Sequence, residues 1–195
     1  MHRQYSIDRP WAAVTPTQRA LQAVVMALVG SMLLAASAKV QIPFWPVPLT
    51  MQTFVVMVLG LSYGPRMGVA TVALYLLEGA LGMPVFAHGA GLAYLTGPTA
   101  GYLLGFLPAT LLMGHLADRG WQRGVVRAMA AALAGDAVMF ACGVSWLAVL
   151  IGPSQAISSG FLPFLPGDLL KIIVAGLAVT GATHLAERRR ANAGQ

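Results

Sequence analysis

Six long apolar stretches, separated by shorter polar, basic or proline-rich segments, set the pattern of this chain. They cover residues 20–38, 49–63, 67–82, 98–116, 128–150 and 167–186. Stretches of this kind are typical of helices that cross a lipid bilayer, where every backbone polar group must be paired within the segment. The pattern predicts an all-α integral membrane protein. We expect one domain over residues 1–195, a bundle of six transmembrane helices, with polar tails at 1–19 and 187–195.

The first apolar stretch has a second interpretation as a secretory signal peptide. Ala36, Ser37 and Ala38 resemble the small-residue site at which such peptides are cleaved. The apolar region of a signal peptide is only about 7–15 residues long, and the stretch 20–38 exceeds that length. We therefore interpret it as the first spanning helix.

Composition and charge agree with a membrane location. Of the 195 residues, 57% are hydrophobic and 9% are charged, with a mean hydropathy of +0.73. Soluble domains carry about 25% charged residues. All the arginines fall in the two tails, at 64–66 and at 117–127, so the positive-inside rule predicts cytoplasmic termini in a bacterial cytoplasmic membrane. This distribution explains the net charge of +6 without nucleic acid as a partner.

The three segments on the opposite side are long and unusually apolar. They are residues 39–48, 83–97 and 151–166, and their aromatic side chains are Phe44, Trp45, Phe86, Tyr94, Phe161 and Phe164. Apolar loops must pack on something, so we expect them to form a lid over a cavity at the outer face. A mainly apolar cavity with a few convergent polar groups is typical of a small-molecule site.

Two charged residues lie at the start of the sixth stretch, on the side of the membrane where these three segments lie. Asp168 and Lys171 share one face of a helix that we expect to begin at Gly167 or Asp168, after two prolines. The acid suits a helix N-terminus, whereas a lysine within the membrane costs up to about 2.5–3.5 kcal/mol. A structural ion pair, a lysine that reaches back to lipid headgroups and a ligand site all explain this spacing.

Other side chains carry weaker signals. Glu78 and Asp136 lie in apolar stretches and could relay a proton or a cation. We favour a protonated or hydrogen-bonded acid for Asp136 and a water-facing acid for Glu78. Cys142 is the single cysteine, so no disulfide is expected. Metal-ligand spacing, nucleotide-binding motifs and hydrolase motifs do not occur, so we expect no metal, no cofactor and no enzyme activity.

Small residues recur at the four-residue spacing that lets helices approach closely in lipid. Gly97, Gly101 and Gly105 form one such series, and Ala23 and Ala27 form a pair in the first helix. For the glycines we favour packing within the chain, and a homo-oligomer interface is the alternative.

Four segments, taken together, resemble one protein family. They are QIPFWPVPLTMQT at 41–53, GMPVF at 82–86, GPTAGYLLGF at 97–106 and PGDLLK at 166–171. In this order they resemble BioY, the biotin-specific substrate-binding (S) component of energy-coupling-factor (ECF) vitamin transporters. The likeness runs from the first helix to the sixth, although Ala100 stands where the family often repeats glycine.

The resemblance implies a six-helix S component that captures biotin from outside with high affinity and carries it across the membrane. It implies a transmembrane coupling subunit and two cytoplasmic ATPases as partners. Ala23 and Ala27 match the alanines through which the family contacts the coupling subunit.

The chemistry of biotin suits the polar pair. Its ureido group and carboxylate offer partners for Asp168 and Lys171, in charge-assisted hydrogen bonds of roughly 1.5–3 kcal/mol each. By position, we expect Trp45, Phe86 and Tyr94 to line the apolar part of the site and Gln52 to add an amide.

Three alternatives stay open at this point. The chain could be a self-sufficient secondary transporter with Glu78 or Asp136 as its proton site. It could be an S component for another vitamin, such as thiamin or riboflavin. It could also be a membrane scaffold in which Asp168 and Lys171 form a structural pair, and this last hypothesis predicts no saturable ligand binding.

Overall fold

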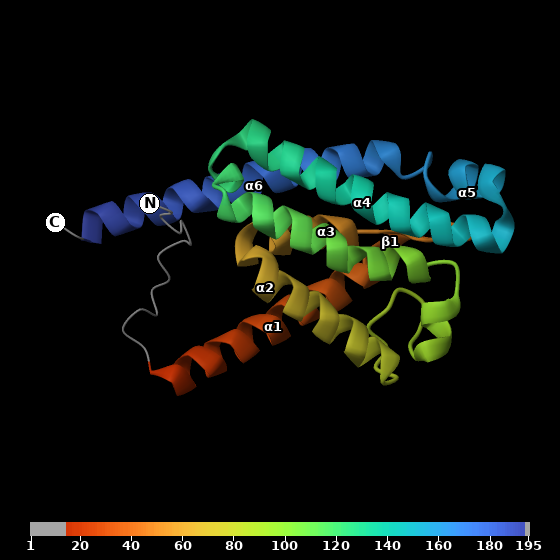
Figure 1. The fold of residues 1–195 in the computed structure, drawn as a ribbon, viewed down its shortest axis with the longest axis horizontal. Coiled ribbons are helices and arrows are strands. Elements are labelled where there is room, and N and C mark those ends of the chain that lie inside the picture. The colour runs from red at the N-terminus through yellow and green to blue at the C-terminus, as the bar shows by residue number, and fades with distance from the viewer. Residues whose placement is uncertain (1–14, 194–195) are drawn as a thin grey trace.

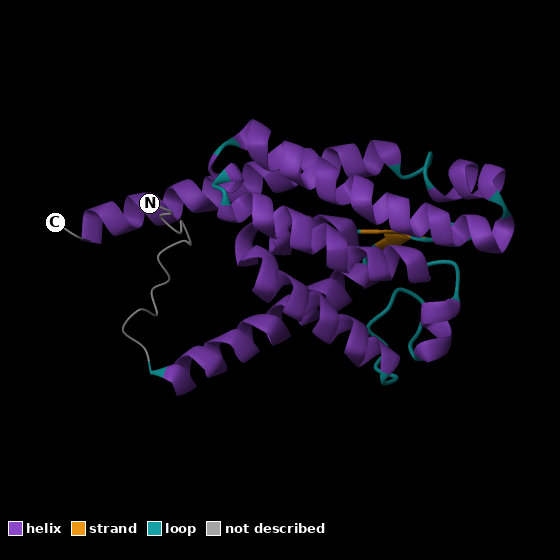
Figure 2. Ribbon diagram, in the orientation of Figure 1, coloured by secondary structure: helices purple, strands orange, loops and turns teal. Residues whose placement is uncertain are grey.

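The computed structural model describes residues 15–193, which form a bundle of helices (Figures 1 and 2). The long helices are α1 Pro16–Lys39, α2 Gln52–Ala80, α3 Ala100–Asp118, α4 Val125–Ile151 and α6 Leu165–Ala193. Shorter elements connect them: β1 Gln41–Ile42, β2 Leu49–Thr50, η1 Leu92–Thr96, η2 Trp121–Arg123 and α5 Pro153–Gly160. Within the described residues, five helices are long and apolar enough to cross a membrane.

Helix α2 contains the second and third predicted helices, joined at one break. Gly64 has φ 75° and ψ 175°, outside the helical region, and Pro65 follows it. Glycine adopts a positive φ readily because it has no Cβ, and proline suits the first turn of the helix that resumes. A Cβ at Gly114 of α3 would lie 2.4 Å from the Pro65 nitrogen, so α3 packs directly on the break. All six predicted apolar helices are therefore present, two of them in one kinked element.

Two helix starts differ from the prediction. Helix α6 begins at Leu165, before the predicted Gly167 or Asp168, and the amide of Asp168 already donates to the Phe164 carbonyl at 2.9 Å. The segment 151–166, predicted as a loop, contains α5. Pro153 does not oppose this helix, because a proline in the first turn removes no helical hydrogen bond. Helix α5 is held to α3 by the Tyr102 hydroxyl, which donates to the Gly160 carbonyl at 2.8 Å.

A two-stranded hairpin connects α1 to α2. Strands β1 and β2 are antiparallel, with Gln41 opposite Thr50 and Ile42 opposite Leu49. The proline-rich turn between them, with a cis Trp45–Pro46 bond, lacks several backbone donors and so cannot continue a helix. Thr50 therefore ends β2 just before α2 begins, and its carbonyl is available to α6.

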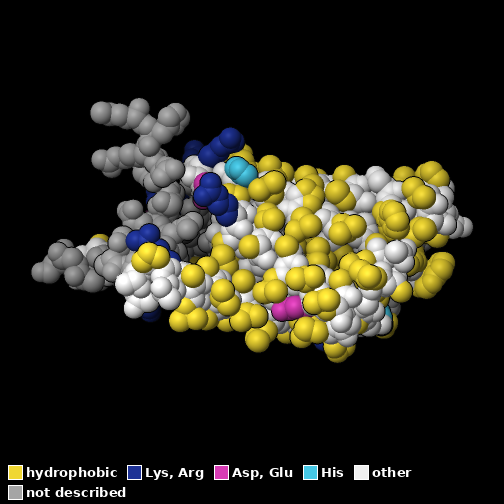
Figure 3. Space-filling view, turned by 60° about the horizontal axis from the view of Figure 1, so that its bottom comes forward, with side chains coloured by type: hydrophobic (Ala, Val, Ile, Leu, Met, Phe, Trp, Pro, Cys, Tyr) yellow, Lys and Arg dark blue, Asp and Glu magenta, His cyan; other side chains and the backbone are white. Residues whose placement is uncertain are grey.

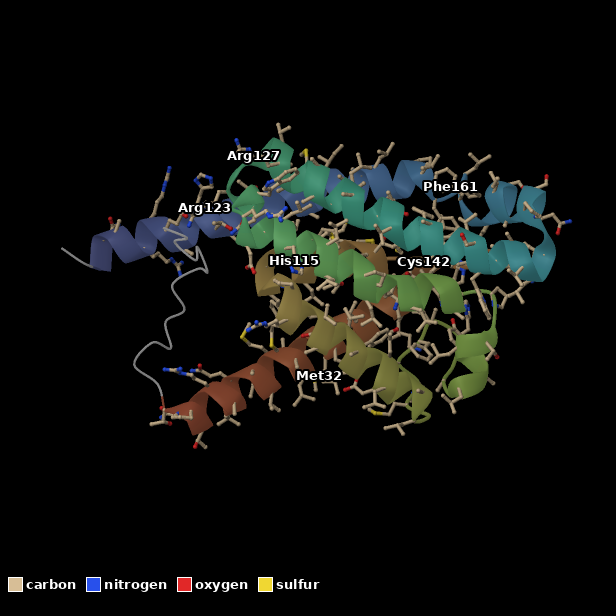
Figure 4. The ribbon with its side chains drawn as sticks, in the orientation of Figure 1. Met32, His115, Arg123, Arg127, Cys142 and Phe161 are labelled. Carbon is tan, nitrogen blue, oxygen red and sulfur yellow. The ribbon has the colours of Figure 1, made fainter. Side chains whose placement is uncertain are left out.

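The two ends of the bundle differ in charge. We call the end that carries β1, β2, η1 and α5 the hairpin end, and the end that carries Arg66, Arg119, Arg123 and Arg127 the basic end. Figure 4 shows Arg123 and Arg127 at one end and Phe161 at the other. The start of α1 and the end of α6 both lie at the basic end (Figure 1). In Figure 3 the basic side chains gather at one end, beside a broad apolar flank that suits lipid.

Candidate ligand-binding site

Lys171 is held at the hairpin end of α6 by three acceptors. Its Nζ donates to the Thr50 carbonyl at 2.8 Å, to Thr53 Oγ1 at 2.9 Å and to Asp168 Oδ1 at 2.7 Å. These bonds use all three donors of the ammonium group. The Lys171 side chain is only 13% exposed, and a buried ion pair needs such additional hydrogen bonds to offset its desolvation. The network fixes the ammonium between α2 and α6.

Asp168 supports this ammonium from a more buried position. The residue is 1% exposed, and its Oδ1 also accepts from Thr53 Oγ1 at 2.8 Å. Its Oδ2 is buried without a hydrogen-bond partner. The sequence-based hypothesis expects both Asp168 and Lys171 to contact a ligand. In this conformation Lys171 lines the neighbouring cavity, whereas Asp168 is not part of its lining.

The cavity lies at the hairpin end, between the helices and the connecting segments. Its polar lining comes from Thr50, Gln52, Thr53, Thr99 and Lys171, and the rest of the lining is mainly aliphatic and aromatic. Each of the three apolar segments contributes: 39–48 gives Val47, 83–97 gives Tyr94 and 151–166 gives Phe164. The prediction that these segments pack over a common cavity is therefore confirmed.

The cavity is small in this conformation. It holds about 40 Å³, enough for a few water molecules, because one water needs roughly 10–15 Å³ by this measure. Pockets for drug-sized ligands have volumes of about 300–1,000 Å³. A bicyclic ligand would therefore enter only if the covering segments moved apart.

Two side chains hold two of the covering segments together. Lys39 Nζ donates to the Phe86 carbonyl at 2.6 Å, and Gln41 Nε2 donates to the Ala87 carbonyl at 3.4 Å. Phe86 is completely buried and stacks on Tyr94, with ring centroids 4.9 Å apart. Tyr94 thus lines the cavity while Phe86 supports it from behind.

Gln52 lines the cavity with its amide already oriented by the protein. Its Nε2 donates to the Tyr75 hydroxyl at 2.7 Å, and the Tyr75 hydroxyl donates to the Val85 carbonyl at 3.1 Å. The Thr50 hydroxyl donates to Gln52 Oε1 at 3.2 Å. This chain of hydrogen bonds links the start of α2 to the segment that carries Phe86.

The remaining predicted site residues lie away from the cavity. Trp45 is 78% exposed on the hairpin turn and is not part of the cavity lining. Ala23 is exposed and Ala27 is half-buried on α1, which packs against α2 and leaves much of its apolar surface uncovered. Met32, farther along the same helix, is 67% exposed (Figure 4).

Sequence reasoning missed Thr50 and Thr53, which together supply two of the three acceptors of Lys171. A signal was present, because the segment 50–53 places three polar side chains between the proline-rich turn and an apolar helix. Nothing in the sequence tied that segment to residue 171. It also missed the contributions of α3 and α4, such as Phe106 and Met139, which look like ordinary core residues.

Two further acids lie within the apolar helices. Glu78 of α2 accepts a hydrogen bond from the Ser31 hydroxyl of α1, so it is paired within the bundle. Asp136 of α4 is 7% exposed, and its Oδ1 has no hydrogen-bond partner. Over residues 15–193, no three His, Cys, Asp or Glu side chains come together as a metal site would require.

The chain has relatives among known proteins. The BioY family matches residues 9–188. The Biotin transporter BioY of Thermotoga maritima is 37% identical over 159 residues, which cover 80% of this chain and 93% of the relative. The Probable biotin transporter BioY of Rickettsia prowazekii is 33% identical over 156 residues, which cover 77% of this chain and 78% of the relative.

A solved structure shares the fold. It is the crystal structure of the S-component for biotin from an ECF-type ABC transporter, with a TM-score of 0.76 and 23% sequence identity. The alignment covers 87% of this chain and 94% of that one. The family match along nearly the whole sequence, with relatives above 30% identity over most of both chains, places this multi-pass membrane protein in the BioY family.

Proposed function

We propose that this chain binds biotin at the hairpin end of the bundle and serves in its uptake across the cytoplasmic membrane. Membership of the BioY family makes the chain a transport protein rather than an enzyme. One observation carries the choice of site: Lys171 is the ionised side chain that lines the apolar cavity, and it is held there by three protein acceptors.

The chemistry of this cavity matches the parts of biotin. Aromatic and aliphatic walls suit the bicyclic ring system and the alkyl chain. Lys171 can donate to a carboxylate or to the ureido oxygen when it gives up one of its present acceptors. Thr50, Thr53, Thr99 and Gln52 add donors and acceptors for the remaining ureido groups.

Asp168 acts, on this account, through Lys171. Its carboxylate neutralises the ammonium and fixes its direction, while the cavity surface is left to Lys171 and the threonines. We therefore propose Asp168 as a positioning residue and Lys171 as the ligand contact.

The chain further acts as the S component of an ECF transporter, with a coupling subunit and two ATPases as partners. The shared fold with a biotin S-component supports this assignment. So does the uncovered apolar face of α1, where Ala23 and Ala27 lie, because a partner helix could pack there. The basic end faces the cytoplasm under the positive-inside rule, which places the cavity outside.

Uptake of labelled biotin by cells without their own biotin transporter tests this function. We expect uptake when the chain is produced with the coupling subunit and the ATPases, and loss of uptake in Lys171→Ala. Uptake by the chain alone that collapses with the proton gradient would instead identify a secondary transporter. Absence of uptake in every combination, with the protein present in the membrane, would contradict the proposal.

A further inference from the structure

Asp136 is a third ionisable side chain buried close to the Lys171 network. It lies on α4 and is 7% exposed. One helical turn farther along α4, Phe140 packs edge to face on Phe164 with ring centroids 6.0 Å apart, and Phe164 lies one turn before Asp168 of α6. Its Oδ1 and the Oδ2 of Asp168 are both buried without hydrogen-bond partners. Two carboxyl groups therefore stand near one ammonium, and each has an oxygen that the protein leaves unpaired.

The charges of this cluster do not balance if every group is ionised. Lys171 donates its three hydrogen bonds to Asp168, to the Thr50 carbonyl and to the Thr53 hydroxyl. Asp136 therefore has no cation of its own in the cluster. A buried charge without a partner is strongly unfavourable in a bundle surrounded by lipid. A proton on Asp136 removes that charge and supplies a hydrogen-bond donor.

Apart from Lys171, the cations on the described elements that pack on α4 lie toward the basic end of the bundle. Helix α5 has no ionisable side chain. The remaining ionisable groups on these elements are engaged elsewhere or exposed at the basic end: Tyr63 with Met26, Tyr75 with Gln52, Glu78 with Ser31, Tyr102 with Gly160, His115 with Leu111, Arg123 with Glu187, His184 with Arg123, and Arg66, Asp118, Arg119, Arg127, Arg188 and Arg189 at the surface. Cys142 is a partly buried thiol farther along α4.

We propose that Asp136 is a proton-binding site, and that it holds its proton while an anionic ligand occupies the cavity. This inference rests on the proposed function, because the carboxylate of the ligand is what adds a further negative charge beside Lys171. A metal cation is a poorer occupant than a proton, since hard cations require about six or more oxygen ligands and this cluster offers two unpaired ones.

Proton binding at Asp136 couples ligand affinity to pH. Above the pH at which Asp136 ionises in the free protein, ligand binding requires that Asp136 take up a proton from solution. The dissociation constant of the ligand therefore rises by up to about tenfold per pH unit. Asp136→Asn keeps a neutral side chain at every pH. The variant should therefore lose the pH dependence, and it should bind more tightly than the wild type at the alkaline end.

Calorimetric titration of the purified full chain with biotin measures this coupling. The titrations run from about pH 6 to about pH 9, where a carboxylate like that of biotin stays ionised, in two buffers of different ionisation enthalpy. We expect net proton uptake by the wild type and by the control Asp118→Asn, whose acid is exposed at the basic end. Neutral biotin amide should show a weaker pH dependence. Net proton uptake on biotin binding that persists in Asp136→Asn would overturn the assignment.

A second readout separates failure of the proton site from failure of the proposed function. Infrared spectra of the ligand-free protein should contain the carbonyl band of a protonated carboxylic acid that Asp136→Asn lacks and Asp118→Asn retains. Biotin binding that is independent of pH, without that band, overturns the proton site and leaves the proposed function intact. Absence of biotin binding with the band present supports the proton site and removes the function. A biotin affinity that depends on the sodium concentration instead of on pH overturns the proton site and identifies a cation site.

Discussion

At the scale of single residues, the site depends on one ammonium group and its acceptors. Lys171→Ala removes the positive charge from the cavity wall, and a charge-assisted hydrogen bond contributes roughly 1.5–3 kcal/mol. We expect the affinity for biotin to fall at least about tenfold, since about 1.4 kcal/mol corresponds to one factor of ten. Titration of the purified variant measures this, with Arg66→Ala at the basic end as the control. Wild-type affinity in folded Lys171→Ala would contradict the assignment.

Asp168 belongs to the same unit as Lys171, so the two should not act independently. Asp168→Asn leaves Lys171 without its counter-ion, and removing one partner of a buried pair costs about 3–5 kcal/mol of stability. We expect lower thermal stability and at least about tenfold weaker biotin binding. In the double variant, binding should be no weaker than in Lys171→Ala alone, because residues in one network are not additive. Additive losses would show that Asp168 contacts the ligand directly.

At the scale of elements, close contacts of glycines fix how the helices pack. Gly114 of α3 lies against the break in α2, and a Cβ there would come within 2.4 Å of the Pro65 nitrogen and 2.5 Å of its Cα. Backbone atoms cannot move aside as side chains do, so overpacking should cost about 1–3 kcal/mol. We expect Gly114→Ala to lower the melting temperature by several degrees, at about 2–4 °C per kcal/mol.

Gly181→Ala provides the matched control for that substitution. It is the same chemical change in an exposed position of α6, where no atom outside the adjacent helix backbone lies within 4 Å of the new Cβ. Alanine favours the helix over glycine by about 0.5–1 kcal/mol, so this variant should melt at the same temperature or slightly higher. The melting temperatures of the two variants are compared by size-exclusion chromatography of samples heated to a series of temperatures. An equal decrease of the melting temperature in both variants would contradict the packing argument.

Which elements could be predicted from the sequence follows from the kind of signal each one leaves. The apolar helices were predictable because burial in lipid demands continuous apolar stretches. The kink at Gly64 was predicted as a turn between separate helices, since Gly-Pro usually ends a helix, and only packing on Gly114 shows how closely the two parts stay joined. Helix α5 was not predicted because its short sequence, with proline in the first turn, resembles that of a loop.

The candidate site was predictable only where charge marked it. Lys171 and Asp168 stood out because charges are rare in apolar helices. Thr50 and Thr53 could not be assigned to Lys171, because their contact bridges more than a hundred positions of sequence and depends on the hairpin register. The burial of Asp168 and the exposure of Trp45 likewise depend on how segments pack, which local patterns do not encode.

At the scale of the whole molecule, the distribution of arginines predicts which end of the bundle faces the cytoplasm. In a variant whose single cysteine is replaced by Cys142→Ala, Ser158→Cys on exposed α5 should react with a membrane-impermeant thiol reagent added to intact cells. Asp118→Cys at the basic end should react only after the membrane is opened. The reverse pattern would place the cavity on the cytoplasmic side and contradict capture from outside.

The most direct test of the central claim is a biotin titration of the purified chain, produced without partner subunits. The account predicts saturable, tight, one-to-one binding that is lost at least in part in Lys171→Ala, because the cavity and its ammonium belong to this chain alone. Absence of saturable binding by protein shown to be folded would contradict it. The cavity would then have to serve a different ligand or none.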